Sequence, residues 1–176
     1  MDQVPEQTAF VERPLGPGLL LGACGSGKTS CLRERAAYLV ESGQLGGEGS
    51  FLVLVPGALA RADVIRRGGG LVSGRNTMTF DEFSEAIVVT LLDRKPDGMY
   101  LGAAAHRALA EVEGGRAAAG LRLVPGLRGA RALLVDDAQE LTGTQYRLVA
   151  AVAGAVVELL DIGGDVVLFD LFWQSL

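Results

Sequence analysis

Eight consecutive residues near the N-terminus carry the clearest chemistry in this chain. The segment from Gly22 to Thr29 fits the pattern G-x-x-x-x-G-K-[ST] and directly follows an apolar run, residues 19–21. Glycine lets the backbone turn so that successive N–H groups point into one concave nest, which suits phosphate oxygens. Lys28 is expected to reach the outer phosphates of ATP, and the Thr29 hydroxyl to hold Mg²⁺. The predicted contacts to the nucleotide come from Gly22, Ala23, Cys24, Gly25, Ser26, Gly27, Lys28, Thr29 and Ser30.

A second apolar run ends in two acids. Residues 132–135 (ALLV) are typical of a buried strand, and Asp136 and Asp137 follow it directly. We expect Asp136 to bind Mg²⁺ and Asp137 to polarise the water that attacks the outer phosphate. Two aspartates can also simply cap the helix that follows, because a helix N-terminus favours negative charge. The two roles are compatible.

Strands that alternate with helices must position these residues. Strands are expected near residues 19–21, 51–55, 76–79, 132–135 and 166–169. Helices are expected over residues 28–41, 81–92, 100–113 and 145–160, with residues 57–74 and 114–131 as connections rich in Gly and Arg. The alternation predicts an α/β fold with a mostly parallel five-stranded sheet, right-handed crossovers and helices on both faces.

Several short segments resemble a known family. The run from Asp136 to Gln139 (DDAQ) is similar to the Asp-Glu-x-Gln-Asp segment of UvrD/Rep/RecB-like superfamily 1 DNA helicases, and closest in style to actinobacterial RecB-like members. Gln7 lies 21 residues before Lys28, where that family places the glutamine that reads adenine. Residues 79–83 (TFDEF) resemble the Thr-Phe-His-x-Phe segment that lines the path of single-stranded DNA.

The resemblance implies a single RecA-like, P-loop ATP-binding domain over residues 1–176, in which ATP hydrolysis drives movement along DNA during processes such as DNA repair. It gives catalytic roles to Lys28, Asp137 and Gln139, adenine binding to Gln7, and Mg²⁺ binding to Thr29 and Asp136. Asp137 stands where the family has glutamate, which shortens the side chain by one methylene and predicts slow hydrolysis, because small misplacements of a catalytic group are expensive in rate.

Two further family motifs are imperfect. The segment after Pro56 lacks the family's Thr/Ser-x-x-Ala-Ala pattern. The Gly-Asp-x-x-Gln motif, which senses the γ-phosphate, fits best at residues 166–170, with Gln174 one place late.

Length limits how much of such a motor this sequence encodes. A chain of 176 residues is about one domain. Family members use two lobes, and an arginine supplied across such a site contributes about 10³- to 10⁵-fold in rate in other NTPases. We therefore expect a first lobe only, which binds ATP, binds single-stranded DNA weakly, and either self-associates through the aromatic tail 166–173 or takes a second lobe or subunit in trans.

Two other functions stay open. A small-molecule P-loop kinase would need an arginine-bearing lid and an acceptor pocket. A non-catalytic scaffold or partner-binding module would keep the fold and lose turnover.

Composition and charge limit the partners and the cellular location that we expect. The net charge of −5 disfavours a self-sufficient nucleic-acid binder, and the cluster of Arg61, Arg66, Arg67 and Arg75 fits either a solvated loop or a DNA-facing rim. The N-terminus is acidic and polar, and no long uncharged apolar run occurs, which predicts a cytoplasmic protein without membrane contact. Cys24 and Cys31 lack the His or Cys partners of a zinc site, and His106 is expected at the surface.

Overall fold

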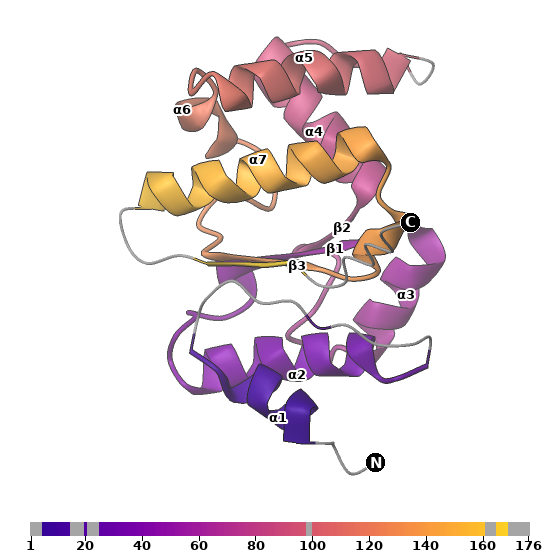
Figure 1. Cartoon of the computed structure of the whole chain (residues 1–176), viewed down its shortest axis with the longest axis vertical. Helices are drawn as coiled ribbons and strands as arrows, with labels where there is room; N and C mark the ends of the chain where they lie inside the picture. The colour runs from indigo at the N-terminus through magenta and orange to yellow at the C-terminus, as the bar shows by residue number, and fades with distance from the viewer. Residues whose placement is uncertain (1–4, 15–19, 21–24, 98–99, 161–164, 169–176) are drawn as a thin grey trace, which may run out of the picture.

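A parallel β-sheet lies between two layers of helices (Figure 1). The computed structural model describes residues 5–14, 20, 25–97, 100–160 and 165–168. Its strands are β1 (Phe51–Val55), β2 (Thr77–Thr79), β3 (Ala132–Val135) and β4 (Asp165–Leu168), in the spatial order β2-β1-β3-β4. Every residue of β1 and β3 is buried, as expected for parallel strands that are covered on both faces.

The prediction of a five-stranded RecA-like sheet is wrong. Within the described residues the sheet has four strands, which correspond to four of the five expected ones. Of the expected first strand, only Leu20 is described, and it lies half-buried against the core outside any strand. A run of only three apolar residues is a weak signal for a strand, because short apolar segments suit several structures.

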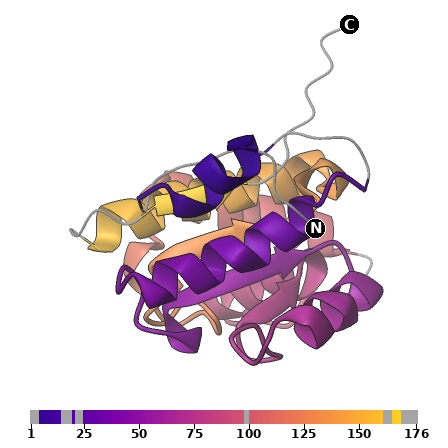
Figure 2. The same cartoon turned by 90° about the horizontal axis from the view of Figure 1, so that it is seen from below.

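Helices cover the two faces of the sheet unequally (Figure 1). One face carries α1 (Pro5–Glu12), α2 (Lys28–Glu41) and α3 (Ala58–Arg67). Figure 2 shows α2 lying across the sheet with α1 beside it. The other face carries α4 (Phe80–Leu92), α5 (Leu101–Glu113), α6 (Ala118–Leu121) and α7 (Gly143–Leu160). Short 3-10 turns, η1 (Glu48–Ser50) and η3 (Ala138–Glu140), adjoin β1 and β3.

Alternation along β1 gives the protein two hydrophobic cores. Phe51, Val53 and Val55 pack with α1, α2 and α3, whereas Leu52 and Leu54 pack with α4 to α7. Pairing is in strict parallel register, with Phe51 opposite Ala132 on β3. The carboxyl ends of the strands therefore meet at one edge, which is where open parallel sheets bind ligands.

The helix α2 is confirmed with its expected bounds, and α4, α5 and α7 lie within two residues of the predicted starts. The sequence did not predict α1, α3 or α6. In α3 the only buried residue is Val64, so this helix lacks the apolar stripe that reveals most surface helices. None of the helices in the described part of the chain combines the length and apolar character needed to cross a bilayer.

Candidate functional site

Glycines in unusual backbone conformations lead into α2. Gly25 and Gly27 have φ angles of +78° and +90°, in the left-handed region that side chains disfavour. Gly27 is the residue before α2, and its carbonyl accepts a hydrogen bond from the Cys31 N–H at 3.0 Å. The first-turn N–H groups of α2 have no partner within the helix and carry its positive dipole end. This geometry suits an anion. The other predicted loop residues, Gly22, Ala23 and Cys24, lie outside the described residues.

The loop meets the end of β3 through Thr29 and Asp136. The Thr29 hydroxyl lies 3.1 Å and 3.0 Å from the two carboxylate oxygens of Asp136, although 107 residues separate them. The backbone N–H of Asp136 donates to the Leu54 carbonyl at 2.8 Å, which continues the ladder one residue past β3. The sheet therefore fixes the acid, and the two side chains predicted to bind Mg²⁺ lie together.

Burial dominates the electrostatics of Asp136. The side chain is 3% exposed, and this desolvation, followed by the negative charge of Asp137, raises the pKa of Asp136 to about 6. The hydrogen bond from Thr29 and the positive charge of Lys28 only partly offset these effects. A carboxylate in such surroundings is stabilised by an added cation.

The oxygen donors of Thr29 and Asp136 fit Mg²⁺. This ion prefers oxygen ligands and is commonly held by one or two protein side chains together with substrate phosphates. Among the described residues no group of three His, Cys, Asp or Glu side chains could hold a metal ion without help. The site therefore suits Mg²⁺ that arrives with a phosphate ligand.

Asp137 occupies a left-handed turn. Its φ and ψ angles are 51° and 48°, a conformation that non-glycine residues adopt rarely and that clusters at functional sites. Its carboxylate accepts a hydrogen bond from the exposed Gln139 side chain at 3.1 Å. No side-chain bond from Asp137 caps η3, so capping does not account for this acid.

Gln7 contacts the phosphate loop. Its side-chain amide donates to the Ser26 carbonyl at 2.8 Å, 19 residues along the chain. Its nitrogen would lie 3.5 Å from a Cβ added at Gly27. Gln7 is thus at the loop, together with Lys28 and Thr29.

A buried arginine that sequence reasoning missed holds α1 in this place. Arg35 on α2 is fully buried and donates to the carbonyls of Val11 at 3.0 Å and Pro14 at 2.8 Å, and also to that of Arg13. Its guanidinium also lies 5.9 Å from the centre of the Phe10 ring. The sequence held a signal, because Arg35 occupies a core-facing position in an apolar stripe at helical spacing, Leu32, Ala36 and Leu39.

The segment that resembles a DNA-lining motif has structural roles. Thr79 caps α4 in a capping box with Glu82, and Phe80 is buried in the core. Glu82 also pairs with Arg61 at 2.8 Å. In the same region Asp63 pairs with both Arg66 and Arg67. Three of the four clustered arginines are therefore paired with acids, two of them with the same aspartate, which favours a solvated surface over a DNA-facing rim.

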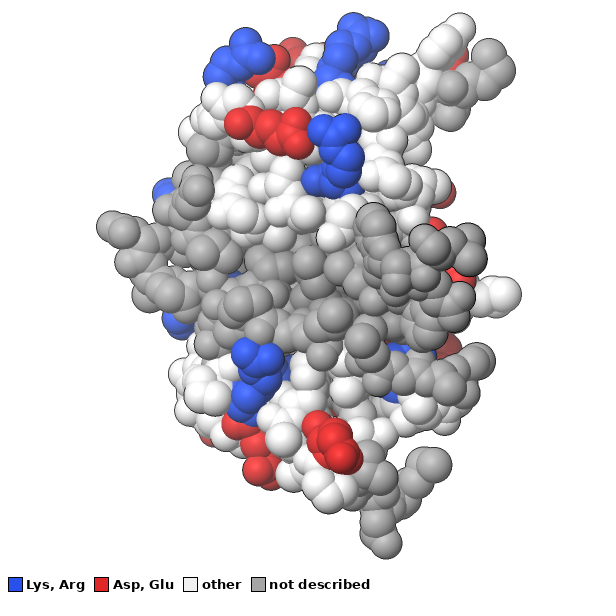
Figure 3. Space-filling view, in the orientation of Figure 1, with Lys and Arg blue, Asp and Glu red and all other residues white. Residues whose placement is uncertain are grey.

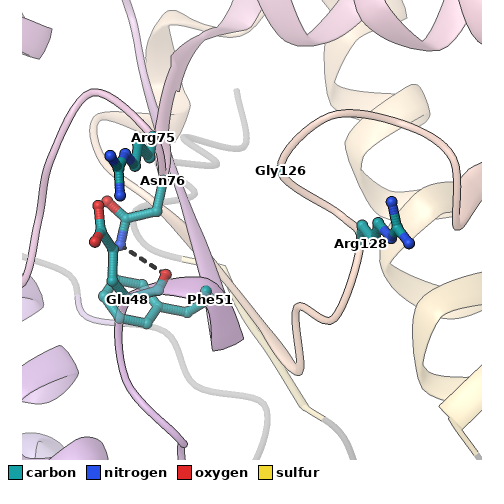
Figure 4. A pocket seen from close by; sticks show the side chains of 7 residues that line it. Glu48, Phe51, Arg75, Asn76, Gly126 and Arg128 are labelled. Carbon is teal, nitrogen blue, oxygen red and sulfur yellow. Dashed lines mark hydrogen bonds between the residues drawn. The ribbon is translucent and has the colours of Figure 1, made fainter.

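A hollow of about 310 Å³ lies at the opposite edge of the sheet (Figure 4). Glu48, Arg75, Asn76 and Arg128, which line it, all precede strands. The Asn76 amide is occupied, since it donates to the carbonyls of Glu48 and Leu71 at 3.1 Å and 3.0 Å. Nothing at this edge joins the phosphate loop, and we assign it no role.

The C-terminal motif lies mostly outside the described residues. The strand β4 stands where it was expected, but Asp170, Gln174 and the aromatic tail beyond Leu168 lie outside the described residues. His106 is exposed, as predicted, and its Nε2 lies 3.0 Å from the Thr144 hydroxyl.

Comparison with known proteins does not place the chain in a family. It matches no protein-family model, and no curated protein matches it.

Proposed function

We propose that this protein binds Mg·ATP at the carboxyl edge of its sheet and is the ATP-binding domain of a UvrD/RecB-like DNA helicase. The observation that carries the proposal is the contact between Thr29 and Asp136 at 3.0 and 3.1 Å. It joins the end of a glycine-rich loop to the acid after a buried strand. This is the pair of ligands that nucleotide-hydrolysing proteins with such loops use for Mg²⁺.

Each residue then has a defined task. The N–H groups at the start of α2 and the ammonium of Lys28 hold the phosphates, while Thr29 and Asp136 hold the metal. Bound Mg²⁺ supplies positive charge that offsets the charge of the phosphates. Asp137 orients the attacking water and accepts its proton, and Gln139 holds the Asp137 carboxylate through the 3.1 Å hydrogen bond.

The position of Gln7 supports the choice of ATP and the helicase class. In the family that the motifs resemble, a glutamine at this distance before the lysine reads adenine, and here Gln7 donates to Ser26 in the loop at 2.8 Å. A phosphate loop by itself gives no reason for a glutamine from a separate helix to lie there. A DNA-dependent ATPase of this class works in the cytoplasm, where ATP and DNA meet.

Calorimetric titration of Mg·ATP tests the binding half of the proposal. Lys28→Ala removes a charged donor to phosphate, and charge-assisted hydrogen bonds are worth roughly 1.5 to 3 kcal/mol, so about a tenfold or greater loss of affinity is expected. Lys95→Ala is the matched control, because Lys95 is the only other lysine and lies in the connection between α4 and α5. Equal affinity of the Lys28→Ala variant and the wild type refutes the phosphate-loop assignment.

Hydrolysis in the presence of DNA tests the helicase half. The expected result is slow release of phosphate that increases when single-stranded DNA is added. Transfer of the phosphate to a small-molecule acceptor, with no response to DNA, supports a kinase instead.

A further inference from the structure

A basic hollow lies between the end of α4 and the start of α5. Its volume is about 230 Å³, and its lining includes Arg94, Lys95, Asp97, Tyr100 and Arg107. Three cations and one acid thus surround it in a chain whose net charge is −5. Figure 3 shows positive and negative side chains interspersed at both ends of one face, and its upper end includes α5.

The charge in this hollow is available to a ligand. Within the described residues, Arg94 and Arg107 make no ion pair or side-chain hydrogen bond. Lys95 only approaches Glu85 at 3.8 Å, and its side chain is 83% exposed. The arginines near α3 differ, because Arg61, Arg66 and Arg67 each pair with an acid at 2.9 Å or less. A surface ion pair as exposed as that of Lys95 contributes little and is readily exchanged for another anion.

An exposed aromatic ring stands beside these cations. Tyr100 is 59% exposed and lines the same hollow as Arg94 and Arg107. A positive groove with an accessible aromatic face matches single-stranded nucleic acid, whose phosphates meet the cations while an unstacked base lies on the ring. A double helix offers no free base face, and an acidic peptide would use the charge without the ring. The hollow is also smaller than the roughly 300–1,000 Å³ typical of small-molecule sites, so it suits part of a longer chain.

The hollow lies in the helical layer and is connected to the carboxyl edge of the sheet through α5 and α7. His106 adjoins Arg107 on α5, and its Nε2 lies 3.0 Å from the hydroxyl of Thr144 at the start of α7. In Figure 1 the helix α5 begins on the side of the molecule where β3 ends. A strand held at the hollow would lie on that side, which also carries Asp136 and Asp137.

We propose that the hollow between α4 and α5 binds single-stranded nucleic acid, with Arg94, Lys95 and Arg107 on the phosphates and Tyr100 stacked on a base. This inference deepens the proposed helicase function and rests on it for the biological role of the strand. It relocates the contact, because Thr79 and Phe80 in the segment that resembles the family's DNA-lining motif are occupied by capping and by the core.

Fluorescence anisotropy with a labelled oligothymidine tests the site in the full chain. Arg94→Ala combined with Arg107→Ala is expected to lower affinity at least tenfold and to make the slope of log K against log salt shallower by about 1.4, since each phosphate contact on a single strand contributes about 0.7. Tyr100→Ala is expected to lower affinity about tenfold, and Tyr100→Phe to retain it, because stacking requires the ring and not the hydroxyl. Arg128→Ala, an exposed arginine at the opposite edge, is the matched control and should bind like the wild type.

Other outcomes overturn the proposal. Wild-type affinity in the arginine double variant excludes this hollow as the site. Loss of binding in that variant with full binding in Tyr100→Ala, or equal displacement of the oligothymidine by polyglutamate, indicates a general anion site. Displacement by duplex DNA at the same concentration excludes selectivity for single strands.

Nucleotide titration of the same proteins separates this inference from the proposed function. The arginine and tyrosine variants should bind Mg·ATP like the wild type, whereas Lys28→Ala should lose ATP and keep the oligothymidine. A wild type that binds the oligothymidine but not ATP refutes the proposed function and leaves this site standing. A wild type that binds ATP but not the oligothymidine refutes this site alone.

Discussion

The Thr29 hydroxyl lies within 3.1 Å of both carboxylate oxygens of Asp136, and the backbone of Asp136 is fixed by a 2.8 Å hydrogen bond to Leu54. The fold thus holds together the two oxygen-bearing side chains that we propose as ligands of Mg²⁺. Because the fold already holds these side chains in place, less conformational entropy is lost when a ligand binds. The arrangement also destabilises the folded protein, because it buries an acid whose ionised form is poorly solvated.

Removal of that acid should stabilise the nucleotide-free protein at neutral pH. Asp136 has a pKa of about 6 in the folded protein and an ordinary value of 3.8, so the folded state binds the proton more tightly between about pH 4 and pH 6. The contribution of Asp136 to stability therefore falls as pH rises through this window. Asp136→Asn should raise the free energy of unfolding above pH 6 by up to the order of 3 kcal/mol, the equivalent of the shift. Urea unfolding at pH 5 and pH 7.5 measures the effect.

Asp63→Asn is a control with the opposite sign. The hydrogen bond from Arg66, together with Arg67, lowers the pKa of the exposed Asp63, so any stability it contributes is lost as pH falls. A pH dependence that is the same in Asp136→Asn and in the wild type contradicts the burial argument for Asp136.

Gln7→Ala should abolish a preference for ATP over GTP. An amide side chain can both donate to and accept from the edge of adenine, a pattern that guanine does not match. Loss of one neutral hydrogen bond costs about 0.5–1.5 kcal/mol, so ATP affinity should fall about three- to tenfold while GTP affinity changes less. Competition between ATP and GTP for the protein measures the ratio of the two affinities. Gln44→Ala, beyond the other end of α2, is the control.

Equal binding of ATP and GTP by the wild type would leave Gln7 with a structural role alone, as the residue that joins α1 to Ser26.

Arg35→Met should release α1 from α2. The substitution keeps an unbranched side chain in the core but removes the donors to the carbonyls of Val11, Arg13 and Pro14. Hydrogen bonds to charged groups are worth roughly 1.5–3 kcal/mol, and the burial of the guanidinium offsets part of this, so a loss of about 2–4 kcal/mol is expected. Limited proteolysis should then cleave within residues 5–14, and nucleotide affinity should fall as Gln7 leaves the loop.

Arg66→Met provides the comparison, because Arg66 is exposed and pairs with Asp63 at the surface. It should lose less than about 1 kcal/mol, the usual value of an exposed ion pair. Resistance of Arg35→Met to proteolysis would show that packing of Phe10 and Val11 alone holds α1.

The sequence predicted the parts of this structure that local chemistry specifies. The glycine-rich loop and the acids after β3 are short patterns with few alternatives, and the bounds of α2 follow from a single apolar face. The meeting of Thr29 with Asp136 follows from parallel strands that end at one edge. Packing between segments far apart in the sequence is harder to predict. The clamp of Arg35 on α1 joins residues about 20 positions apart, and no local pattern specifies which carbonyls a buried arginine will bind.

Two errors have different physical causes. The expectation of a fifth strand depends on the apolar residues 19–21, and an apolar run of this length suits several structures. The helix α3 was overlooked because its surface is mostly polar, although Ala58, Ala60 and Ala62 favour a helix and Asp63 pairs with Arg67 one turn later.

Asp137 should govern turnover, and its effect on affinity should appear only at pH values near the pKa of Asp136. Asp137→Asn removes the carboxylate and keeps a residue that tolerates the left-handed conformation, so the turn and the bond from Gln139 can persist. At pH 7.5 Mg·ATP binding should be preserved while single-turnover hydrolysis, measured with protein in excess and with single-stranded DNA present, falls about 10²- to 10⁴-fold, the usual contribution of a general base. Because the charge of Asp137 helps to raise the pKa of Asp136, the Asn variant should also bind Mg·ATP more tightly than the wild type at pH 6. Asp137→Glu introduces the longer acid found in the helicases that this segment resembles. This variant should hydrolyse ATP faster but lose about 1 kcal/mol of stability, because a larger side chain is less favourable at positive φ. If the Asn variant hydrolyses ATP at the wild-type rate, Asp137 is not the base. If neither the wild type nor Asp137→Glu hydrolyses ATP that it binds, the chain is a nucleotide-binding scaffold.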